Sequence, residues 1–534
     1  MKSPRLLESA SVVSSLTLLS RILGMVRTMI AASIFGSTLA MDAFVIAFTV
    51  PNLFRRLFGE GALSSAFVPV YTRTLEQDGK AKAQVLFNSL LTRVGLILFG
   101  LTLLGIGGCY LLDWTIHHSP SLVQALKTSG DYDKVLLTSA LLRILFPYLF
   151  LVCVLALLSA LLNSLGHFAS PSLAPIVLNV FWIGGLVWLA PVFGARPDQM
   201  IIGVAVAVLI GGVAQVATQI PAMRSRGIGF RPHLVGAPPE IGEIRRLMVP
   251  MIFGAAVMQL NILIDRAIAV GMVAGDGAVS ALYYGDRLIQ FPMSLTGIAI
   301  AVAAFPILSR HVARGEMKEA AEKVAASCKG ILAVTLPATI GLAILSMPII
   351  ELIYERGVFG AVDSVRTARV LILYSLGLWA FSGQHVLVRA FYSLRMQSVP
   401  VRVATGMVAL NLVLNLSLVG PLQEAGLALA TAITGVIQFC LLLFLLRRRL
   451  PELRGLGLLP SFYRSLSISI VMGVAVWITL AYGSPVGSST SARALRVVIP
   501  MLVGIGIYAA ASALLRTPEF LTVASAIRRR FKKS

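Results

Sequence analysis

Long apolar runs recur from one end of the chain to the other. A transmembrane helix needs about 20 consecutive, mostly apolar residues. Runs of this kind without a charged residue cover 172–195, 199–223, 247–264, 288–309, 330–350, 403–422, 425–446, 465–492 and 497–515. Runs with a few charged residues cover 11–34, 42–72, 88–112, 135–162 and 363–394. Together these segments predict an all-α, polytopic membrane protein of about fourteen transmembrane helices.

A weak internal repeat divides this pattern into two halves. The segment AFVPVYTRTLEQDGKAKA (66–83) aligns with AAFPILSRHVARGEMKEA (303–320), an offset of 237 residues. Six helices fit this period, so the two copies run in the same direction, an arrangement common among transporters. We therefore predict two pseudo-symmetric six-helix lobes followed by two C-terminal helices. The predicted boundaries are 1–222 for an N-lobe (helices 1–6), 223–246 for a cytoplasmic Arg-rich linker, 247–447 for a C-lobe (helices 7–12), 448–515 for helices 13 and 14, and 516–534 for a basic cytoplasmic tail.

Composition and charge agree with a membrane protein. Hydrophobic residues make up 57% of the chain and charged residues only 13%, against roughly 25% charged in soluble domains. The net charge of +22 would suggest a nucleic-acid partner in a soluble protein, but here the basic residues mostly lie between apolar runs. Most of these loop Lys and Arg residues fall on one side of the membrane if the N-terminus is cytoplasmic. We therefore predict no nucleic-acid partner and two cytoplasmic termini.

Several ionisable residues lie within the apolar runs, where they are costly and usually face a cavity or a partner. They are Arg21, Arg27, Arg55, Arg56, Glu60, Arg143, Asp265, Arg266, Asp286, Arg287 and Arg389. Arginine predominates in this set, so internal pairing does not neutralise it, and we predict a cavity with surplus positive charge. Snorkelling to the interface is the alternative; it explains Arg143, Arg389 and Arg56 well, and Arg27 and Arg287 also lie within snorkelling reach. Because the planar guanidinium binds phosphate oxygens in pairs, the remaining arginines point to an anionic, lipid-linked diphosphate substrate.

A second group of polar residues lies in the C-terminal half. Asn411 and Asn415 are four residues apart and therefore share a helix face, and Thr431 lies in the following apolar run. With Asp265, these side chains offer oxygen ligands that suit Na⁺. Hydrogen bonding between helices explains the same residues more simply. A sodium site is the further prediction from this set.

Four sequence segments carry a resemblance to a known family. They are SRILGMVR (20–27), MDAFVIAFTVPNLFRRLFGEGALSSAFVP (41–69), YYGDRLIQFP (283–292) and FYSLRMQSVPVRV (391–403). They resemble the MurJ (MviN) lipid II flippases of the multidrug/oligosaccharidyl-lipid/polysaccharide exporter superfamily, and the resemblance runs nearly end to end. It implies a protein of the bacterial inner membrane that moves lipid II, an undecaprenyl-diphosphate-linked peptidoglycan precursor, to the periplasmic leaflet by alternating access.

The resemblance also implies roles for individual residues. Arg27, Arg55 and Arg287 match family arginines that contact the diphosphate region. Arg21 is expected to bind the substrate together with these three, and the residues expected to support the same cavity are Asp42, Arg56, Glu60 and Asp286. Helices 13 and 14 (448–515) match a groove for the lipid tail, and a sodium site in one branch of the family resembles Asp265, Asn411, Asn415 and Thr431. Thr28, Gln290 and Asn415 replace acidic residues that are common in relatives, which makes the cavity more positive and argues against sodium.

The remaining expectations concern energy coupling, partners and competing functions. A positive cavity fits coupling to the membrane potential, and no other cofactor is expected. The expected partners are lipid II and membrane lipids. We expect a monomer, and proteins of cell-wall synthesis or division are candidate protein partners. No DDxxD, HExxH or P-loop motif occurs, so we do not expect an enzyme. An exporter of another polyprenyl-diphosphate-linked oligosaccharide or polysaccharide is the alternative, because charge alone does not distinguish it.

Overall fold

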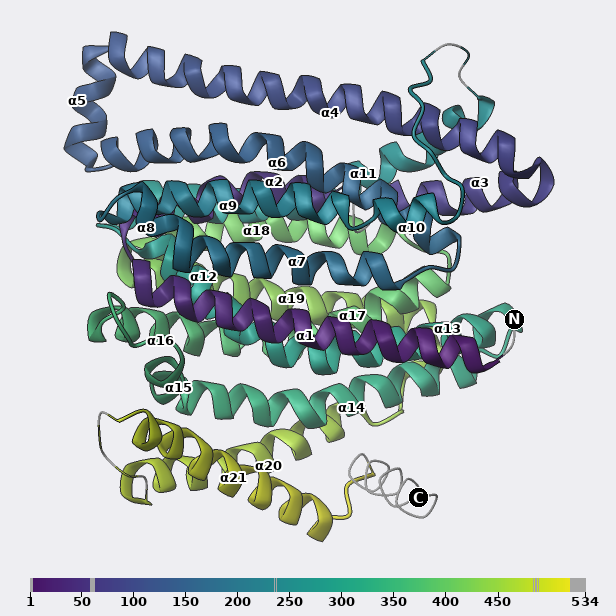
Figure 1. The fold of residues 1–534 in the computed structure, drawn as a ribbon. Helices are drawn as coiled ribbons and strands as arrows, with labels where there is room; N and C mark the ends of the chain where they lie inside the picture. The colour runs from purple at the N-terminus through teal and green to yellow at the C-terminus, as the bar shows by residue number, and fades with distance from the viewer. Residues whose placement is uncertain are drawn as a thin grey trace. The chain divides into compact units, whose positions relative to one another are not determined.

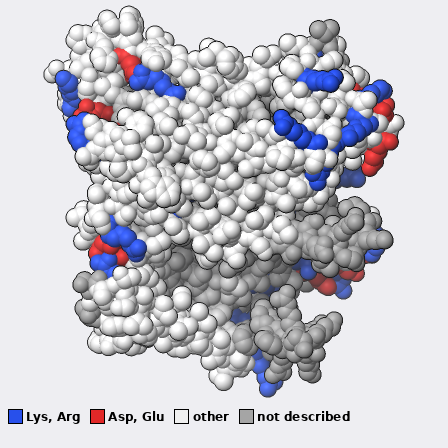
Figure 2. Space-filling view, viewed as in Figure 1, with Lys and Arg blue, Asp and Glu red and all other residues white. Residues whose placement is uncertain are grey.

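The computed structural model describes residues 3–57, 63–234, 236, 238–483, 485, 487 and 489–518. Every regular element within these ranges is a helix (Figure 1). This confirms the predicted all-α class. On the face drawn in Figure 2, the Lys, Arg, Asp and Glu side chains gather near the ends of the helices, while the middle stretches of the helices are uncharged. Such a distribution suits helices whose middle stretches lie in hydrocarbon.

The chain forms two compact units. The first takes Met1–Gly271 and Gly275–Ser280, and the second takes Met272–Ala274 and Ala281–Ser534. The helices of the first unit are α1 (Ser3–Phe35), α2 (Leu39–Phe54), α3 (Leu63–Gln77), α4 (Gly79–His118), α5 (Pro120–Ser129), α6 (Tyr132–Ser164), α7 (Ala169–Gly184), η2 (Gly185–Leu189), α8 (Ala190–Phe193), α9 (Pro197–Ala217), α10 (Ile220–Arg224) and α11 (Pro239–Met272). Within this unit the largely buried α6 packs against α2, α4 and α9.

The second unit holds the rest of the helices. They are α12 (Ala278–Met293), which begins in the first unit, η3 (Ser294–Ile298), α13 (Ala299–Ala313), α14 (Met317–Ile344), α15 (Ser346–Ile353), α16 (Ala361–Ser375), α17 (Leu378–Ser393), α18 (Ser398–Leu422), α19 (Glu424–Arg449), η4 (Pro451–Leu453), α20 (Leu458–Ile478), η5 (Thr479–Gly483) and α21 (Thr490–Leu514). Here α14 is central, because it contacts α13, α17 and α20. The last two helices, α20 and α21, pack against each other as a hairpin.

The number of membrane spans is close to the predicted one. By length and composition, 11 of the described helices could cross a membrane, or 12 if the pair α16 and α17, bent by 43°, is one span. Neither α2, with 16 residues, nor α3, with 15, is long enough alone. For the α2–α3 segment and for α11, a full span therefore stays a prediction, and so does the total of fourteen.

Two features of the helix order agree with the predicted repeat, which itself stays a prediction. The long α1 (33 residues) and α11 (34 residues) open the two copies. In each copy the next predicted span is broken by a π-helical turn, at residues 55–57 after α2 and at η3 after α12. Pro51 and Pro292 lie within the helices that end at these breaks, and proline removes a backbone donor there. The contact-based division places α11 with the first unit, whereas the predicted C-lobe begins at 247, and those lobe boundaries stay predictions.

Two predicted boundaries near the C-terminus are wrong. The last helix begins at Thr490 instead of 497, and α20 begins at Leu458 instead of 465. The Ser489 hydroxyl caps the start of α21 by accepting a hydrogen bond from Ala492 N, at 3.2 Å. Arg493 and Arg496 therefore lie in the first turns of α21, although the sequence pattern had placed them in a loop. Charge-free length underestimates a helix whose first turns carry paired arginines.

Candidate functional site

Arg27 is buried on α1 and is held by two side chains of α7. Its side chain is 8% exposed, and its Nη1 donates a hydrogen bond to Asn179 Oδ1 at 2.9 Å. The guanidinium carbon lies 4.0 Å from the ring centroid of Trp182, a cation–π contact. Asn179 Nδ2 in turn donates to the backbone carbonyl of Ser20, which lies earlier on α1, at 2.9 Å. One amide thus fixes both the backbone of α1 and the guanidinium it carries.

Trp182, whose ring contacts Arg27, belongs to an aromatic cluster that holds the indole in place. The rings of Phe44 and Phe48 on α2 meet Trp182 edge-on, with centroids 5.3 and 4.8 Å away. Tyr148 on α6 stacks against Phe48 at 6.0 Å. Such close-packed rings leave little freedom for the indole, and hence for the cation above it. Sequence reasoning missed Asn179 and Trp182, although an Asn within the charge-free run 172–195 was a usable signal.

The other cavity candidates in the first unit lie on α1 and in the π turn after α2. Arg55 is half-buried in the π turn after α2, where its Nε donates to Asn52 Oδ1 at 3.0 Å. Arg56, next to it, is also half-buried. Arg21 is exposed, and six residues of helix place it about 240° around α1 from Arg27. Glu60 lies outside the described residues, so its predicted role stays a prediction.

Asp42, for which a supporting role in the cavity stays a prediction, is buried on α2 and contacts the start of α12. Its side chain is 1% exposed, and its carboxylate accepts hydrogen bonds from the backbone N–H groups of Gly277 and Ser280, both at 2.8 Å. The Ser280 hydroxyl donates a third, at 2.6 Å. Lys134, 3% exposed, forms an ion pair with Asp276 at 3.0 Å. A buried carboxylate at the N-terminus of α12 is favourable, because free N–H groups and the helix dipole meet it there.

Arg287 is half-buried on α12, with an aromatic partner on the same helix. Its guanidinium carbon lies 4.9 Å from the ring centroid of Tyr283, four residues earlier and therefore on the same face. Its Nε is buried and has no hydrogen-bond acceptor among the described residues. Next to it, Asp286 accepts a hydrogen bond from Gln290. Gln290, which departs from the family pattern, thus serves as a neutral partner for that carboxylate.

The predicted sodium ligands are distributed over the two units. Asn415 Nδ2 donates to Asn411 Oδ1 at 2.8 Å, and both side chains are buried in the second unit. The Thr431 hydroxyl donates to the backbone carbonyl of Leu427 at 3.0 Å. Asp265 belongs to the first unit, where its carboxylate accepts from Asn261 at 3.5 Å. Each of these predicted ligands takes part in a hydrogen bond within the protein. Sodium binding stays a prediction.

The remaining arginines at membrane depth have local partners. Arg143 pairs with Asp113 at 3.1 Å and lies 4.8 Å from the ring centroid of Tyr110. Arg266 donates to the carbonyl of Val279 at 3.0 Å, and Arg389 to that of His385 at 3.2 Å. Such contacts satisfy these cations within the fold. The predicted roles of Arg27, Arg55, Arg287 and Arg21 in binding a substrate stay predictions.

Comparison with known proteins identifies the family. The sequence model of the lipid II flippase MurJ matches residues 31–495 of this chain. The chain belongs to the MurJ family. The probable lipid II flippase MurJ of Vibrio cholerae is 34% identical over 450 residues, 82% of either chain. That of Rhizobium tropici is 34% identical over 502 residues, which cover 92% of this chain and 91% of the relative.

Solved structures agree with the MurJ assignment at the level of the fold. A structure of the lipid II flippase MurJ in an inward closed conformation has a TM-score of 0.77 at 24% identity, and the match covers 94% of this chain and 98% of that one. An inward-facing multidrug resistance transporter of the MATE family has a TM-score of 0.65 at 13% identity, covering 83% and 99%. This MurJ family member thus shares its fold with transporters, and it is a multi-pass membrane transporter, not an enzyme.

Proposed function

We propose that this protein moves lipid II from the cytoplasmic to the periplasmic leaflet of the bacterial inner membrane by alternating access. One observation carries the proposal beyond family membership. Arg27 is a buried cation that a neutral amide and an indole ring hold in place. These two partners orient the guanidinium. A buried guanidinium fixed in this way suits an anionic ligand, because its planar fork binds phosphate oxygens in pairs.

The chemistry of the arginines suits the diphosphate of lipid II. A guanidinium donates two parallel hydrogen bonds to phosphate oxygens, and such charge-assisted bonds strengthen where water is scarce. Arg27 and Arg55 supply such groups in the first unit and Arg287 in the second. The buried Nε of Arg287 has no described acceptor, so it offers a donor for a ligand oxygen. Arg21 and Arg56 add positive charge nearby along their own helices.

Finer features follow from the same proposal. Both termini lie in the cytoplasm, and the hairpin of α20 and α21 holds the polyprenyl tail. The protein acts as a monomer in contact with membrane lipids. The membrane potential drives transport, because a positive site that carries a diphosphate across the membrane moves charge. Sodium bound by Asp265, Asn411, Asn415 and Thr431 is a second coupling route, which sodium-dependent thermal stabilisation of the purified protein tests.

The proposal is tested by measuring lipid II in the outer leaflet after rapid inactivation of the protein in cells. Lipid II then accumulates in the inner leaflet, out of reach of an external probe. Unchanged access from outside would contradict flipping. A matched assay in vesicles compares lipid II with another polyprenyl-diphosphate-linked oligosaccharide. Transport of that oligosaccharide alone would support the alternative exporter instead.

A further inference from the structure

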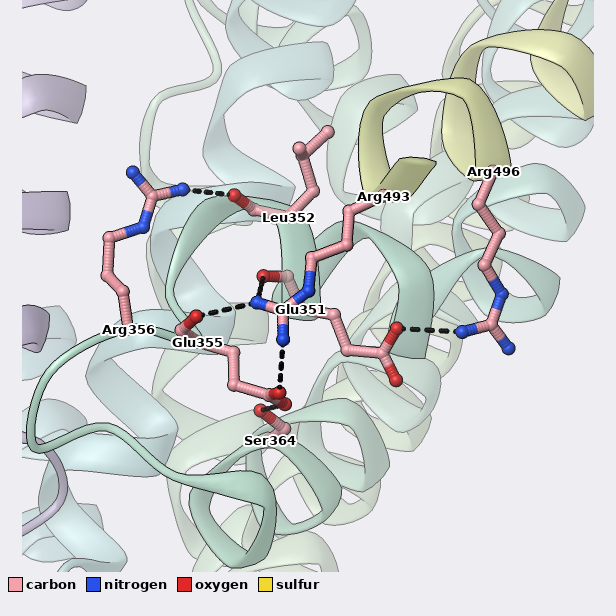
Figure 3. A network of polar contacts seen from close by, with 7 residues as sticks. All are labelled: Glu351, Leu352, Glu355, Arg356, Ser364, Arg493 and Arg496. Carbon is pink, nitrogen blue, oxygen red and sulfur yellow. Dashed lines mark hydrogen bonds and ion pairs between the residues drawn. The ribbon is translucent and has the colours of Figure 1, made fainter. Parts of the chain in front are cut away.

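The C-terminal hairpin is fastened to α15 at the end where α21 begins. Arg493 Nη1 donates to the backbone carbonyls of Glu351, at 3.2 Å, and Glu355, at 2.7 Å. Its Nη2 donates to the Glu355 carboxylate at 2.9 Å (Figure 3). Arg496 forms a separate ion pair with the Glu351 carboxylate, also at 2.9 Å. Two neighbouring arginines of α21 thus bind two carboxylates one helical turn apart.

Arg493 does more than balance a charge. The last carbonyls of a helix have no partner within it and carry the negative end of the helix dipole. By donating to the carbonyls of Glu351 and Glu355, Arg493 caps the end of α15 and the turn that follows. Its side chain is 23% exposed and that of Glu355 is 19% exposed, so the ion pair is only partly screened by water. The position of α21 is therefore tied to the path of the turn after α15.

Glu355 also connects α21 to α16. Its second carboxylate oxygen accepts a hydrogen bond from the Ser364 hydroxyl at 2.6 Å. Ser364 is fully buried in the first turn of α16. Figure 3 shows Glu355 between Arg493 and Ser364, with Arg356 directed away from α21 toward the carbonyl of Leu352. One carboxylate thus joins α21 to the start of α16.

The residue immediately before Glu355 packs toward α12. Tyr354 is fully buried, and its ring centroid lies 5.1 Å from that of Tyr284. Phe359 completes a buried trio, with centroids 5.5 Å from Tyr284 and 5.8 Å from Tyr354. Tyr284 in turn follows Tyr283, whose ring carries the Arg287 guanidinium. Because buried rings have no free space around them, a shift of Tyr354 displaces Tyr284 and its helix.

We propose that the turn at 354–355 couples the α20–α21 hairpin to Arg287, so that Arg493 and Glu355 are positioning residues for substrate binding. Glu355 contacts Arg493 of α21, and Tyr354 contacts Tyr284 of α12. A single peptide bond joins Tyr354 to Glu355. A change in the hairpin, such as occupation by a lipid tail, therefore alters the setting of Arg287 on α12. The inference rests on the proposed binding of the lipid II diphosphate by Arg287.

The experiment measures the affinity of purified lipid II for the full-length protein in lipid nanodiscs. Arg493→Ala is expected to raise the Kd about fivefold or more, the lower range of typical coupling between sites. Arg356→Ala is the control in the same turn, because Arg356 is exposed and bonds only within its own segment in Figure 3. Arg496→Ala is the control for attachment, because it loosens the hairpin without touching Glu355. Both controls are expected to change the Kd less than twofold.

A double-mutant cycle tests the path itself. Tyr354→Phe removes the hydrogen bond that the Tyr354 hydroxyl donates to the Tyr284 carbonyl at 3.5 Å, and it keeps the ring. Tyr354→Phe and Arg493→Ala are expected to be non-additive in Kd, whereas Tyr354→Phe and Arg356→Ala are expected to add. Thermal unfolding of each variant separates loss of affinity from loss of fold. Should Arg493→Ala prove unstable, Glu355→Gln keeps the carbonyl bonds of Arg493 and removes only the charge, with a smaller rise in Kd expected.

Each outcome bears on one proposal. If the parent binds lipid II, Arg287→Ala loses binding and Arg493→Ala behaves like Arg356→Ala, the coupling is wrong and the flippase proposal stands. Equal effects of Arg493→Ala and Arg496→Ala would likewise contradict it and indicate simple attachment of the hairpin. If the parent itself does not bind lipid II, the proposed function fails first.

Discussion

Arg27 and Arg287 are both predicted to lie at membrane depth, but the fold holds them by different means. The amide that binds Arg27 lies 152 residues away on α7, and the ring beneath it also comes from α7. The ring beneath Arg287 is Tyr283, on the same helix. Tertiary packing therefore fixes Arg27 in place, whereas Arg287 follows whatever α12 does. The position of the Arg27 guanidinium is therefore fixed, whereas that of the Arg287 guanidinium changes when neighbouring elements move α12.

The largest expected effect is common to both arginines. Arg27→Ala and Arg287→Ala are each expected to lower lipid II flipping by about a hundredfold or more, because each removes a charge-assisted bond to the diphosphate from a site of low dielectric. Flipping is measured as lipid II reaching the outer leaflet of vesicles. Both variants should still insert and purify as monomers. Normal flipping by either variant would remove that arginine from the site.

Lysine replacements are expected to separate the two sites. Lysine keeps the charge but not the planar fork, so it cannot stack on Trp182 and bond Asn179 as Arg27 does. Arg27→Lys should therefore lose nearly as much flipping as Arg27→Ala, while Arg287→Lys should retain a measurable fraction. The same vesicle assay compares the four variants. Equal retention by both lysine variants would mean that the rigid setting of Arg27 is irrelevant to transport.

A smaller effect is expected from the residue that positions Arg27. Asn179→Ala leaves one guanidinium N–H without its acceptor, a loss of about 1–3 kcal/mol. The expected result is a roughly tenfold weaker affinity for lipid II, together with a modest fall in Tm. Gln290→Ala, which removes the neutral partner of Asp286 near Arg287, is the matched change in the second unit. If Asn179→Ala binds lipid II like the parent, α7 does not position Arg27 for the substrate.

The smallest effect is expected at an exposed arginine outside the membrane. Arg73 donates to Glu243, with one N–O distance of 3.2 Å, and this hydrogen bond holds the pKa of the Glu243 carboxyl below its usual value. A lowered folded-state pKa gives stability that is present above the usual glutamate pKa and is lost as pH falls through the lowered one. Both side chains are well exposed, so Arg73→Ala should leave flipping unchanged and Tm nearly so.

That variant also gives a baseline for the comparison. The small difference in Tm between Arg73→Ala and the parent should shrink further at high salt and as pH falls through the lowered pKa of the Glu243 carboxyl. Thermal unfolding across pH and salt measures it. A large loss of flipping in Arg73→Ala would mean that removal of any arginine impairs this protein, and the losses at Arg27 and Arg287 would then carry no positional information.

The sequence predicted the helical class, and it marked the repeat and the candidate arginines, because each leaves a local signal. Apolar length marks a span, and an arginine within such a run stands out. Partners far away in the chain leave no such signal, which is why Asn179 and Trp182 were missed. Tyr283 is visible beside Arg287 in YYGDRLIQFP, but its ring contact depends on side-chain direction. The pairing of Arg493 with Glu355 required knowledge of two helices separated by 138 residues.

The π turn between α12 and α13 changes the direction in which the side chains of α12 point relative to those of α13. Such a turn holds one more residue than an α-helical turn, so side chains before η3 are rotated by about 100° relative to an uninterrupted helix. Arg287 therefore faces a direction that no single helical wheel drawn through 278–313 predicts. Removing one residue from 294–298 would merge the two helices into one regular rod and swing Arg287 by about a quarter of a revolution about the helix axis.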